Sequence, residues 1–368
     1  MIKITALTQG PPSHSCSRFR VRQYIEPLSS LGIQINEYVP IISTYQAVPP
    51  KDRLPEWMNS GIYNRCLRYI WQGKKIINRI PGILASQTSD ITWLQREIIP
   101  FRFTLEPLLK HPLVFDVDDV IWQFQSSSYS YNSVVGQRVA QSIAKIAKCA
   151  DVVIVGNSYL AQWFSDYSSN IRIIPTAVDT ERYKPLVATN NQSKKFTIGW
   201  IGSDANIQYL YGVETPLKHF LRDFADSEIL IVSDKPPSFR DLSNDQVRYI
   251  AWSPEVEVQA IQQMDIGIMP LVKDGYTIGK CSLKMLQYMA CGLPVVVSPV
   301  GMNAEVLALG NLGLGVEKES DWYDALVVLY QHRERGNQYG REGRRIVEDY
   351  FSQKVIVKEL ASIFKELA

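Results

Sequence analysis

Lys280 and Lys284 stand four residues apart, and two lysines at this spacing could bind an anion together. A spacing of four places both side chains on one face of a helix. Two like charges in a first turn repel each other and oppose the helix dipole, at a cost of about a few tenths of a kcal/mol. A bound anion would offset both effects, and Gly279 would let it reach the backbone N–H groups. The alternative is that one lysine, Lys284 in particular, is simply solvated.

The elements that would position these lysines follow from the same stretch. Leu283, Leu286 and Ala290 share one helical face, which predicts a helix over 282–290 that packs on a sheet. The next four residues, Cys-Gly-Leu-Pro, end this helix, because Gly accepts a left-handed cap and Pro cannot continue a helix. The valines at 295–297 predict a strand covered on both faces. Gly301 then opens a loop into a second short helix, for which we expect Asn303 as the cap.

A helix start that faces strand ends, with glycine at each approach, is typical of an anion site. Helix–glycine–strand units also occur in every parallel α/β domain, and most of them bind nothing there. The pattern alone therefore leaves both interpretations open. A P-loop at 275–280 is excluded, because its two glycines are one residue too close and Cys281 stands where Ser or Thr must hold magnesium.

The segment LKMLQYMACGLPVVVSPVGMNAEV, residues 283–306, resembles the donor-binding segment of retaining glycosyltransferases of family 4. The resemblance implies an α/β protein of the GT-B fold, with two Rossmann-like doubly wound parallel-sheet domains facing a cleft. It also implies transfer of a hexosyl unit from a nucleoside-diphosphate sugar to a hydroxyl acceptor, with retention. In that family a Glu-x7-Glu pair contacts the donor sugar and the ribose. Here the two positions are Gly279 and Gln287, and Gln287 can still donate to and accept from ribose hydroxyls.

The resemblance further implies a diphosphate site. In the family, the loop after the first strand of the second domain supplies an Arg and a Lys, but the matching loop here, 202–207, has neither. We expect Lys280 and Lys284 to replace that pair. We expect no metal and no cofactor beside the nucleoside-diphosphate sugar, which is the substrate. The residues expected to bind the donor diphosphate and nucleotide are Gly202, Ser203, Gly279, Lys280, Cys281, Ser282, Lys284 and Gln287.

The amino-terminal region predicts a strand at 2–7, a loop at 9–17, a helix from about 18 to 31 and a strand at 33–39. Ligands of such sheets bind at strand-end loops, and in related transferases this loop lies in the interdomain cleft. A helix start rich in arginine, with Arg18, Arg20 and Arg22, is either a solvated basic surface or a site for an acceptor phosphate. The residues expected on the acceptor side are Gly10, Ser13, Ser15 and Arg18.

Three carboxylates, Asp116, Asp118 and Asp119, lie where a predicted strand at 113–117 ends. In the resembling family this strand ends in a segment whose His lies by the donor sugar, and Asp118 occupies that position. Asp118 is therefore the expected catalytic residue, either orienting an acceptor hydroxyl or supporting the developing cation at the anomeric carbon. The alternative is a structural role as a helix cap or ion-pair partner.

At 368 residues the chain suits two domains. We expect an acceptor-binding domain at 1–178, a nucleotide-sugar-binding domain at 179–350 and a helix at 351–368 that returns to the first domain. The net charge of +2 indicates no nucleic-acid partner. Five cysteines without paired spacing favour reduced thiols and a cytoplasmic location. We see no signal peptide and no apolar run near the roughly 20 residues that span a bilayer.

The segment 51–80 is basic and rich in aromatic residues. It either contacts an anionic membrane surface peripherally, at the inner face of the membrane, or forms a helical insert that packs on the first domain. A second functional class also stays open. Loss of both Glu positions and of the usual Arg/Lys pair would suit a catalytically silent GT-B partner subunit or a nucleotide-sugar-binding protein.

Overall fold

The computed structural model describes residues 1–12, 14–42, 61–123, 133–186, 195–243 and 245–368. The chain forms two compact units. Unit 1 contains residues 1–174 together with 357–368, and unit 2 contains residues 175–356. The division at Ile174 therefore precedes the boundary expected after residue 178, and the last residues of the chain belong to unit 1.

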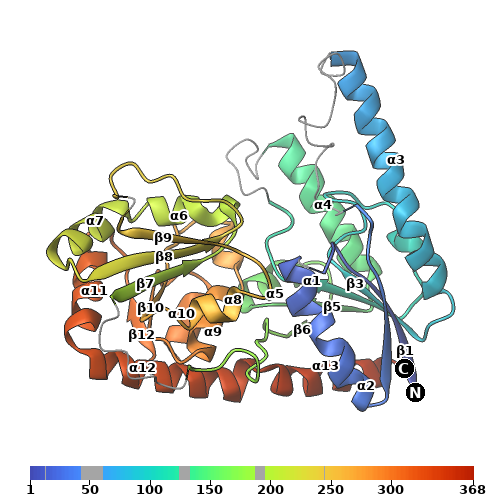
Figure 1. Ribbon diagram of the computed structural model, residues 1–368. Coiled ribbons are helices and arrows are strands. Elements are labelled where there is room, and N and C mark those ends of the chain that lie inside the picture. The colour runs from blue at the N-terminus through green and yellow to red at the C-terminus, as the bar shows by residue number, and fades with distance from the viewer. Residues whose placement is uncertain (13, 43–60, 124–132, 187–194, 244) are drawn as a thin grey trace. The chain divides into compact units, whose positions relative to one another are not determined.

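Unit 1 is built on a parallel sheet of six strands in the order β2-β1-β3-β4-β5-β6 (Figure 1). Its central strands are buried along their length, as their nearly continuous apolar sequences require. The order reverses between β1 and β3, and ligands of open α/β sheets bind outside the carboxyl ends of strands at such a point. The strands are β1 (Ile2–Leu7), β2 (Ile33–Tyr38), β3 (Ile91–Gln95), β4 (Leu113–Val117), β5 (Val152–Val155) and β6 (Ile171–Ile173).

The single helix expected from about 18 to 31 is wrong. The structure has a helix α1 that begins at Ser15 and ends at Arg20, a 3-10 turn, and a separate helix α2. Val21 interrupts the run with φ −127°. At the break, the buried Arg20 side chain pairs with Asp116 on β4. The helices of unit 1 are α1 (Ser15–Arg20), α2 (Ile25–Ser30), α3 (Gly61–Ser86), α4 (Val134–Cys149), α5 (Ser158–Phe164) and the end of α13 (Gln353–Leu367).

Unit 2 is a second parallel sheet of six strands, in the order β12-β11-β10-β7-β8-β9. The order reverses between β7 and β10, so this unit too has a switch point where a ligand is expected. The α/β fold of two doubly wound parallel sheets expected from the sequence is confirmed. The strands are β7 (Phe196–Ile201), β8 (Ser227–Ser233), β9 (Val247–Ala251), β10 (Ile266–Met269), β11 (Val295–Val297) and β12 (Gly313–Gly315).

Helix α9 (Leu283–Ala290) packs tightly against the sheet of unit 2. A Cβ added to Gly267 on β10 would lie 2.2 Å from the Tyr288 ring, so this contact needs glycine. The hydroxyl of Tyr288 accepts a hydrogen bond from the Ile201 backbone N–H at 2.9 Å. Gly292 ends the helix with φ +75°, as expected for a left-handed cap. The other helices are α6 (Ile207–Tyr211), α7 (Glu214–Asp223), α8 (Glu257–Ile261), α10 (Met302–Leu307), α11 (Asp321–Gln331) and α12 (Arg333–Ile346).

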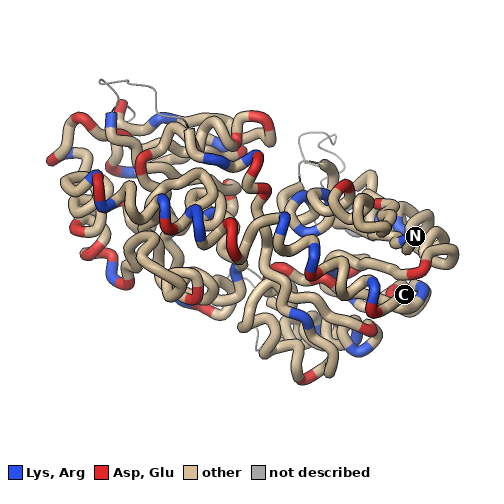
Figure 2. The backbone as a smooth tube through the Cα atoms, turned by 90° about the horizontal axis from the view of Figure 1, so that it is seen from below, with Lys and Arg blue, Asp and Glu red and all other residues tan. Residues whose placement is uncertain are grey.

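Basic and acidic residues are interspersed along the chain in each unit, as Figure 2 shows. This intermixing agrees with the small net charge of the chain. Across the ranges that the structure describes, no helix combines the length and apolar character needed to span a membrane.

Candidate functional site

The amino terminus of α9 carries no side-chain cap. Ser282, the residue before the helix, lies in the left-handed region with φ +51°. Its hydroxyl donates to Asn303 Oδ1 at 2.6 Å, and Asn303 Nδ2 donates to the backbone oxygen of Ser298 at 3.0 Å. Asn303 therefore joins two loops and does not cap α10 as expected; Gly301 precedes that helix. The N–H groups of the first turn of α9 are left for solvent or an anion.

Gly301 brings the loop after β11 against the segment before α9. It has φ +56°, and a Cβ there would lie 2.1 Å from the backbone oxygen of Ile278. No other residue fits this contact without movement of the backbone. Gly279, which follows Ile278, is buried. The close approach therefore fixes the loop that leads to Lys280.

The two lysines reach the loop that follows β7. Lys284 Nζ lies 4.5 Å from the centroid of the Trp200 ring, and a Cβ on Gly202 would lie 2.7 Å from the same Nζ. Lys280 Nζ lies 3.2 Å from Asn206 Oδ1. Burial, and secondarily the positive charge of Lys280, lower the pKa of Lys284 to about 7. Both lysines thus lie at the carboxyl end of β7, at the switch point of unit 2.

The other residues expected at the donor site lie around the same loops. Ser203 is exposed, and its hydroxyl accepts from Asn206 Nδ2 at 2.9 Å. Cys281 is buried with its Sγ 3.9 Å from the backbone oxygen of Gly279. The structure therefore brings Gly202, Ser203, Gly279, Lys280, Cys281, Ser282 and Lys284 to one end of unit 2.

Gln287 lies in a buried network one turn further along α9. Its amide nitrogen donates to Glu257 Oε1 at 2.6 Å and to the Tyr183 hydroxyl at 3.1 Å. Trp252 Nε1 donates to Glu257 Oε2 at 2.9 Å, and the Tyr183 hydroxyl also bonds Glu257. Glu257 was not found from the sequence, because a single Glu at the start of a short helix gives no local signal. Gln287 is 4% exposed, and these contacts occupy its amide nitrogen.

In unit 1, Asp118 is held by Arg96. Arg96 Nε donates to Asp118 Oδ1 at 2.7 Å, and its Nη2 lies 3.6 Å from Asp119 Oδ2. Burial opposes ionisation of Asp118, but the Arg96 guanidinium outweighs it, so the pKa of Asp118 lies below its usual range. The side chains of Asp118 and Arg96 are 11% and 10% exposed, so the pair reaches the surface of unit 1. Asp118 is therefore ionised and paired, and it can accept a hydrogen bond.

The arginines expected either in solvent or at a phosphate make internal contacts instead. Arg20 binds Asp116 through two hydrogen bonds of 2.8 and 3.1 Å. Arg22 Nη2 lies 2.7 Å from Glu37 Oε1. Both interpretations are thus wrong for Arg20 and Arg22. Of the residues expected on the acceptor side, Arg18 stacks on the Phe19 ring at 4.6 Å, Ser15 is exposed, Gly10 lies after β1, and Ser13 lies outside the described residues.

Residues 195–332, from the start of β7 to the end of α11, match the family model described as Glycosyl transferases group 1. Over these residues the chain is similar to group 1 glycosyl transferases. The match includes every residue that the sequence placed at the donor site. The resemblance of residues 283–306 to a glycosyltransferase segment is thereby confirmed, while family 4 and the retaining mechanism stay predictions.

The whole chain also shares its fold with solved structures. It matches sucrose-phosphate synthase from Thermosynechococcus elongatus with a TM-score of 0.72 at 14% identity, covering 100% of this chain and 99% of that one. It matches Anabaena HepE in complex with UDP with a TM-score of 0.66 at 12% identity, covering 100% of both chains. A glycosyltransferase from Rickettsia africae matches with a TM-score of 0.63 at 15% identity, covering 99% of this chain and 98% of that one. These likenesses show the GT-B fold. No curated protein matches the chain by sequence.

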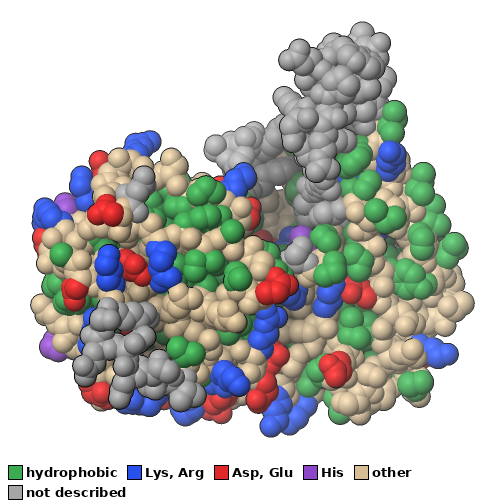
Figure 3. All heavy atoms as spheres, viewed as in Figure 1, with side chains coloured by type: hydrophobic (Ala, Val, Ile, Leu, Met, Phe, Trp, Pro, Cys, Tyr) green, Lys and Arg blue, Asp and Glu red, His purple; other side chains and the backbone are tan. Residues whose placement is uncertain are grey.

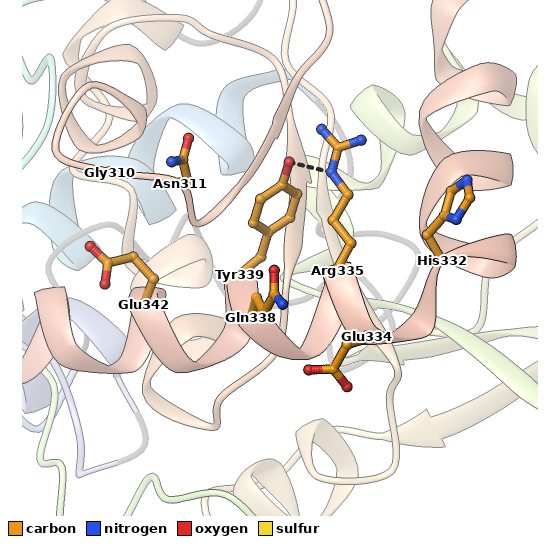
Figure 4. A pocket seen from close by; sticks show the side chains of 8 residues that line it. All are labelled: Gly310, Asn311, His332, Glu334, Arg335, Gln338, Tyr339 and Glu342. Carbon is orange, nitrogen blue, oxygen red and sulfur yellow. Dashed lines mark hydrogen bonds between the residues drawn. The ribbon is translucent and has the colours of Figure 1, made fainter.

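Unit 2 also has an open cavity, lined by none of the residues expected to bind the donor (Figure 4). Its volume is about 900 Å³. Figure 4 shows Arg335 directed at Tyr339, and the two side chains are joined by a hydrogen bond of 2.6 Å. The cavity shares no residue with the donor site. Its lining residues are Gly310, Asn311, His332, Glu334, Arg335, Gln338, Tyr339 and Glu342.

Metal ligands were not expected at the donor site. Within the ranges that the structure describes, no group of three or more His, Cys, Asp or Glu side chains is arranged to hold a metal ion.

Proposed function

We propose that the protein is a retaining glycosyltransferase that moves a hexosyl unit from a nucleoside-diphosphate sugar to a hydroxyl acceptor. The proposal rests on one observation: Lys280 and Lys284 lie at the start of α9, which has no side-chain cap. The family match covers these residues. One neighbour of the same fold, HepE, supports the donor class, since it is solved both with UDP and with UDP-glucose.

In this proposal the diphosphate binds at the amino end of α9. The backbone N–H groups of the first turn and the helix dipole favour its negative charge. Lys280 and Lys284 add two cationic donors, and a bound diphosphate would return the Lys284 amine to its charged form. Gly202 leaves room for this, because any side chain there would occupy the position of the Lys284 amine.

The nucleotide would extend from the diphosphate toward Gln287. Glu257 and Tyr183 hold the amide nitrogen of Gln287, so its carbonyl oxygen is oriented to accept from a ribose hydroxyl. Glu257 thus supports the position at which the resembling family has a carboxylate. We propose Glu257 as a positioning residue for this contact.

The proposed chemistry is attack by the acceptor hydroxyl on the same face from which the diphosphate leaves. It needs no nucleophile from the protein and no cofactor beside the donor. The two lysines and the helix start stabilise the charge that develops on the leaving diphosphate.

Thermal shift and calorimetry with UDP-glucose, GDP-glucose and ADP-glucose test the donor site. We expect one nucleotide sugar to bind and to be hydrolysed slowly by the purified protein. Lys280→Ala and Lys284→Ala should each weaken binding about 10- to 100-fold, the loss typical of a hydrogen bond to a charged group. Lys218→Ala on α7, an exposed lysine outside the site, is the matched control.

Two outcomes separate the alternatives. Binding without hydrolysis or transfer to any acceptor would favour a nucleotide-sugar-binding protein. Failure to bind any nucleotide sugar would favour a silent partner subunit. Unchanged affinity in both lysine variants would end the assignment of the diphosphate site.

We also propose that α3 makes a peripheral contact with the inner face of a membrane. Its buried side packs on unit 1, where Arg79 donates to the backbone oxygens of Thr8 and Ile98. Its other side exposes apolar residues, which gather over this helix in Figure 3. Residues 51–60 of the predicted segment lie outside the described residues. The exposed apolar residues of the described part are Ile70, Ile76, Ile77, Ile80 and Leu84.

Co-sedimentation with anionic liposomes at low salt tests this contact. We expect binding to phosphatidylglycerol vesicles and a loss of binding when Ile77 and Leu84 are both changed to Ser. If the unaltered protein does not bind these vesicles, α3 is only a helical insert that packs on unit 1 and makes no membrane contact.

A further inference from the structure

The cavity of unit 2 lies at the opposite edge of the sheet from the donor residues. Asn311 comes just before β12, and His332 links α11 to α12. The guanidinium carbon of the next residue, Arg333, lies 3.8 Å from the centroid of the Phe196 ring, and Phe196 begins β7. The cavity is therefore at the amino ends of the parallel strands, whereas the donor residues lie at the carboxyl end of β7. A molecule in this cavity would occupy a site of its own.

One face of α12 forms a wall of the cavity. Lining residues at positions 332, 335, 339 and 342 are three or four apart, a spacing that places side chains on one face of a helix. In Figure 4, His332 and Arg335 are directed to the same side of α12, while Glu334 points away from them. The two basic side chains of the lining thus lie together.

Both carboxylates of the lining are paired with arginines outside it. Glu342 accepts two hydrogen bonds from Arg345, of 2.7 and 3.1 Å. Glu334 accepts one from Arg341 at 3.0 Å. Hydrogen bonds from these arginines hold the pKa of each carboxyl below its usual range. Both groups are therefore ionised, and their negative charge is already balanced.

The basic side chains of the lining lack such partners. In the ranges that the structure describes, no Asp or Glu forms an ion pair with Arg335 or His332. Arg335 Nε donates to the Tyr339 hydroxyl at 2.6 Å, and the guanidinium carbon lies 5.3 Å from the centroid of that ring. Tyr339 itself packs against the hydrophobic core of unit 2, so it holds the guanidinium in place. The Nη1 and Nη2 groups can then bind a carboxylate or a phosphate in fork geometry.

The cavity is much larger than a simple inorganic anion. Its volume of about 900 Å³ lies in the range of small-molecule sites. Asn311 and Gln338 contribute exposed amides, and each amide both donates and accepts hydrogen bonds. Groups of this kind bond hydroxyls, such as those of a sugar. The lining therefore suits a polar molecule that carries one anionic group.

We propose that this cavity binds a small hydroxyl-bearing metabolite with a phosphate or carboxylate group, at a second site separate from the donor site. Arg335 binds the anionic group through Nη1 and Nη2, with His332 beside it. The amides of Asn311 and Gln338 bond the hydroxyls. The inference goes beyond the proposed function, because it assigns a ligand that is neither the donor nor the acceptor.

Isothermal titration calorimetry on the full chain tests this site with four probes. Galactose 6-phosphate and galacturonate carry the two kinds of anion on the same sugar, galactose lacks the anion, and inorganic phosphate lacks the sugar. We expect one of the two anionic sugars to bind about 10- to 100-fold more tightly than galactose, the contribution of a hydrogen bond to a charged group. The one that binds identifies the anion.

Inorganic phosphate should bind about tenfold more weakly than the anionic sugar, because it does not reach the amides. The proposal is overturned if neither anionic sugar binds, if galactose binds as tightly, or if inorganic phosphate does.

Variants of the lining supply the second readout. Arg335→Gln should weaken binding of the anionic sugar about 10- to 100-fold, and Tyr339→Phe, which removes only the hydroxyl that holds Nε, about 3- to 10-fold. Asn311→Trp fills the cavity without removing a charge and should abolish binding. Arg240→Gln, at an exposed arginine elsewhere in unit 2, is the matched control. Unchanged affinity in Arg335→Gln and Asn311→Trp would show that the sugar binds elsewhere, and the proposal would fail.

Competition separates this site from the donor site, where Lys280 and Lys284 could also attract a sugar phosphate. We expect the anionic sugar to bind as tightly in the presence of saturating UDP-glucose as in its absence. Displacement by UDP-glucose, or loss of binding in Lys284→Ala, would place the probe at the donor site and overturn the proposal. If UDP-glucose does not bind but Arg335→Gln still removes binding of the anionic sugar, the proposed transferase function fails and the second site stands.

Discussion

The amine of Lys284 lies 4.5 Å from the centre of the Trp200 ring, at the end of β7. Within the described ranges, no carboxylate forms an ion pair with this lysine. An aromatic face stabilises a cation only modestly, by about 0.5–2 kcal/mol. The positive charge is therefore unfavourable at this position until an anion arrives. The loop that contains Gly301 holds the segment before α9 in place, and α9 in turn carries Lys284.

The affinity for UDP-glucose should fall as the pH rises from 7 to 9. Lys284 has its pKa lowered to about 7 in the free protein, and a bound diphosphate would raise it. Above pH 7 binding must therefore take up a proton, and the affinity should drop by up to about tenfold for each pH unit. Calorimetry in buffers of different ionisation enthalpy would count this proton. Proton release, or a flat profile, would contradict the prediction.

The free protein should be stabilised by Lys284→Met at low pH. An unfolded lysine titrates near 10.5 and the folded one near 7, so the unfolded state binds more protons between these values. The destabilisation by Lys284 is therefore complete below pH 7 and fades as the pH rises toward 10.5. Melting temperatures at pH 6 and pH 10 should show a large advantage of the variant only at pH 6. Lys218→Met should show no such difference between the two conditions.

Gly301→Ala should destabilise unit 2 and weaken donor binding. Its φ is +56°, and the new methyl group would lie 2.1 Å from the backbone oxygen of Ile278. The loss should exceed about 1 kcal/mol, because the native backbone is incompatible with alanine. Urea denaturation measures it. Gly73→Ala in α3 is the control, since nothing lies within 4 Å of its Cβ and helix propensity alone predicts a gain of about 0.5–1 kcal/mol. Equal effects at both sites would refute the argument.

Asp116→Asn should destabilise unit 1 strongly. Arg20 and Asp116 are 3% and 1% exposed and share two hydrogen bonds. Removing one charge of such a pair leaves the other buried and uncompensated, at a cost of about 3–5 kcal/mol. The double variant Arg20→Met with Asp116→Leu should lose less than the single one. Chemical denaturation of the three proteins checks this order, and additive losses would show that the two residues do not act as a pair.

Local patterns in the sequence determined the framework of this protein. Apolar runs of strand length predicted strands at 2–7, 33–39, 113–117 and 295–297. Each of these strands is present, and they belong to the two parallel sheets. The end of α9 was also predicted locally, and Gly292 ends this helix with φ +75°. These features depend on backbone geometry within a few residues, which a sequence displays directly.

Only the tertiary structure decided which polar groups meet. Arg20 pairs with Asp116, 96 positions away, and the helix that the sequence predicted as continuous ends at Arg20. Gln287 bonds Glu257, and Lys284 stacks on Trp200, through contacts between separate elements of unit 2. Burial and charge neutralisation depend on neighbours that are brought together by the fold. The spacing of Lys280 and Lys284 could therefore be seen in the sequence, but the environment that shifts the pKa of Lys284 could not.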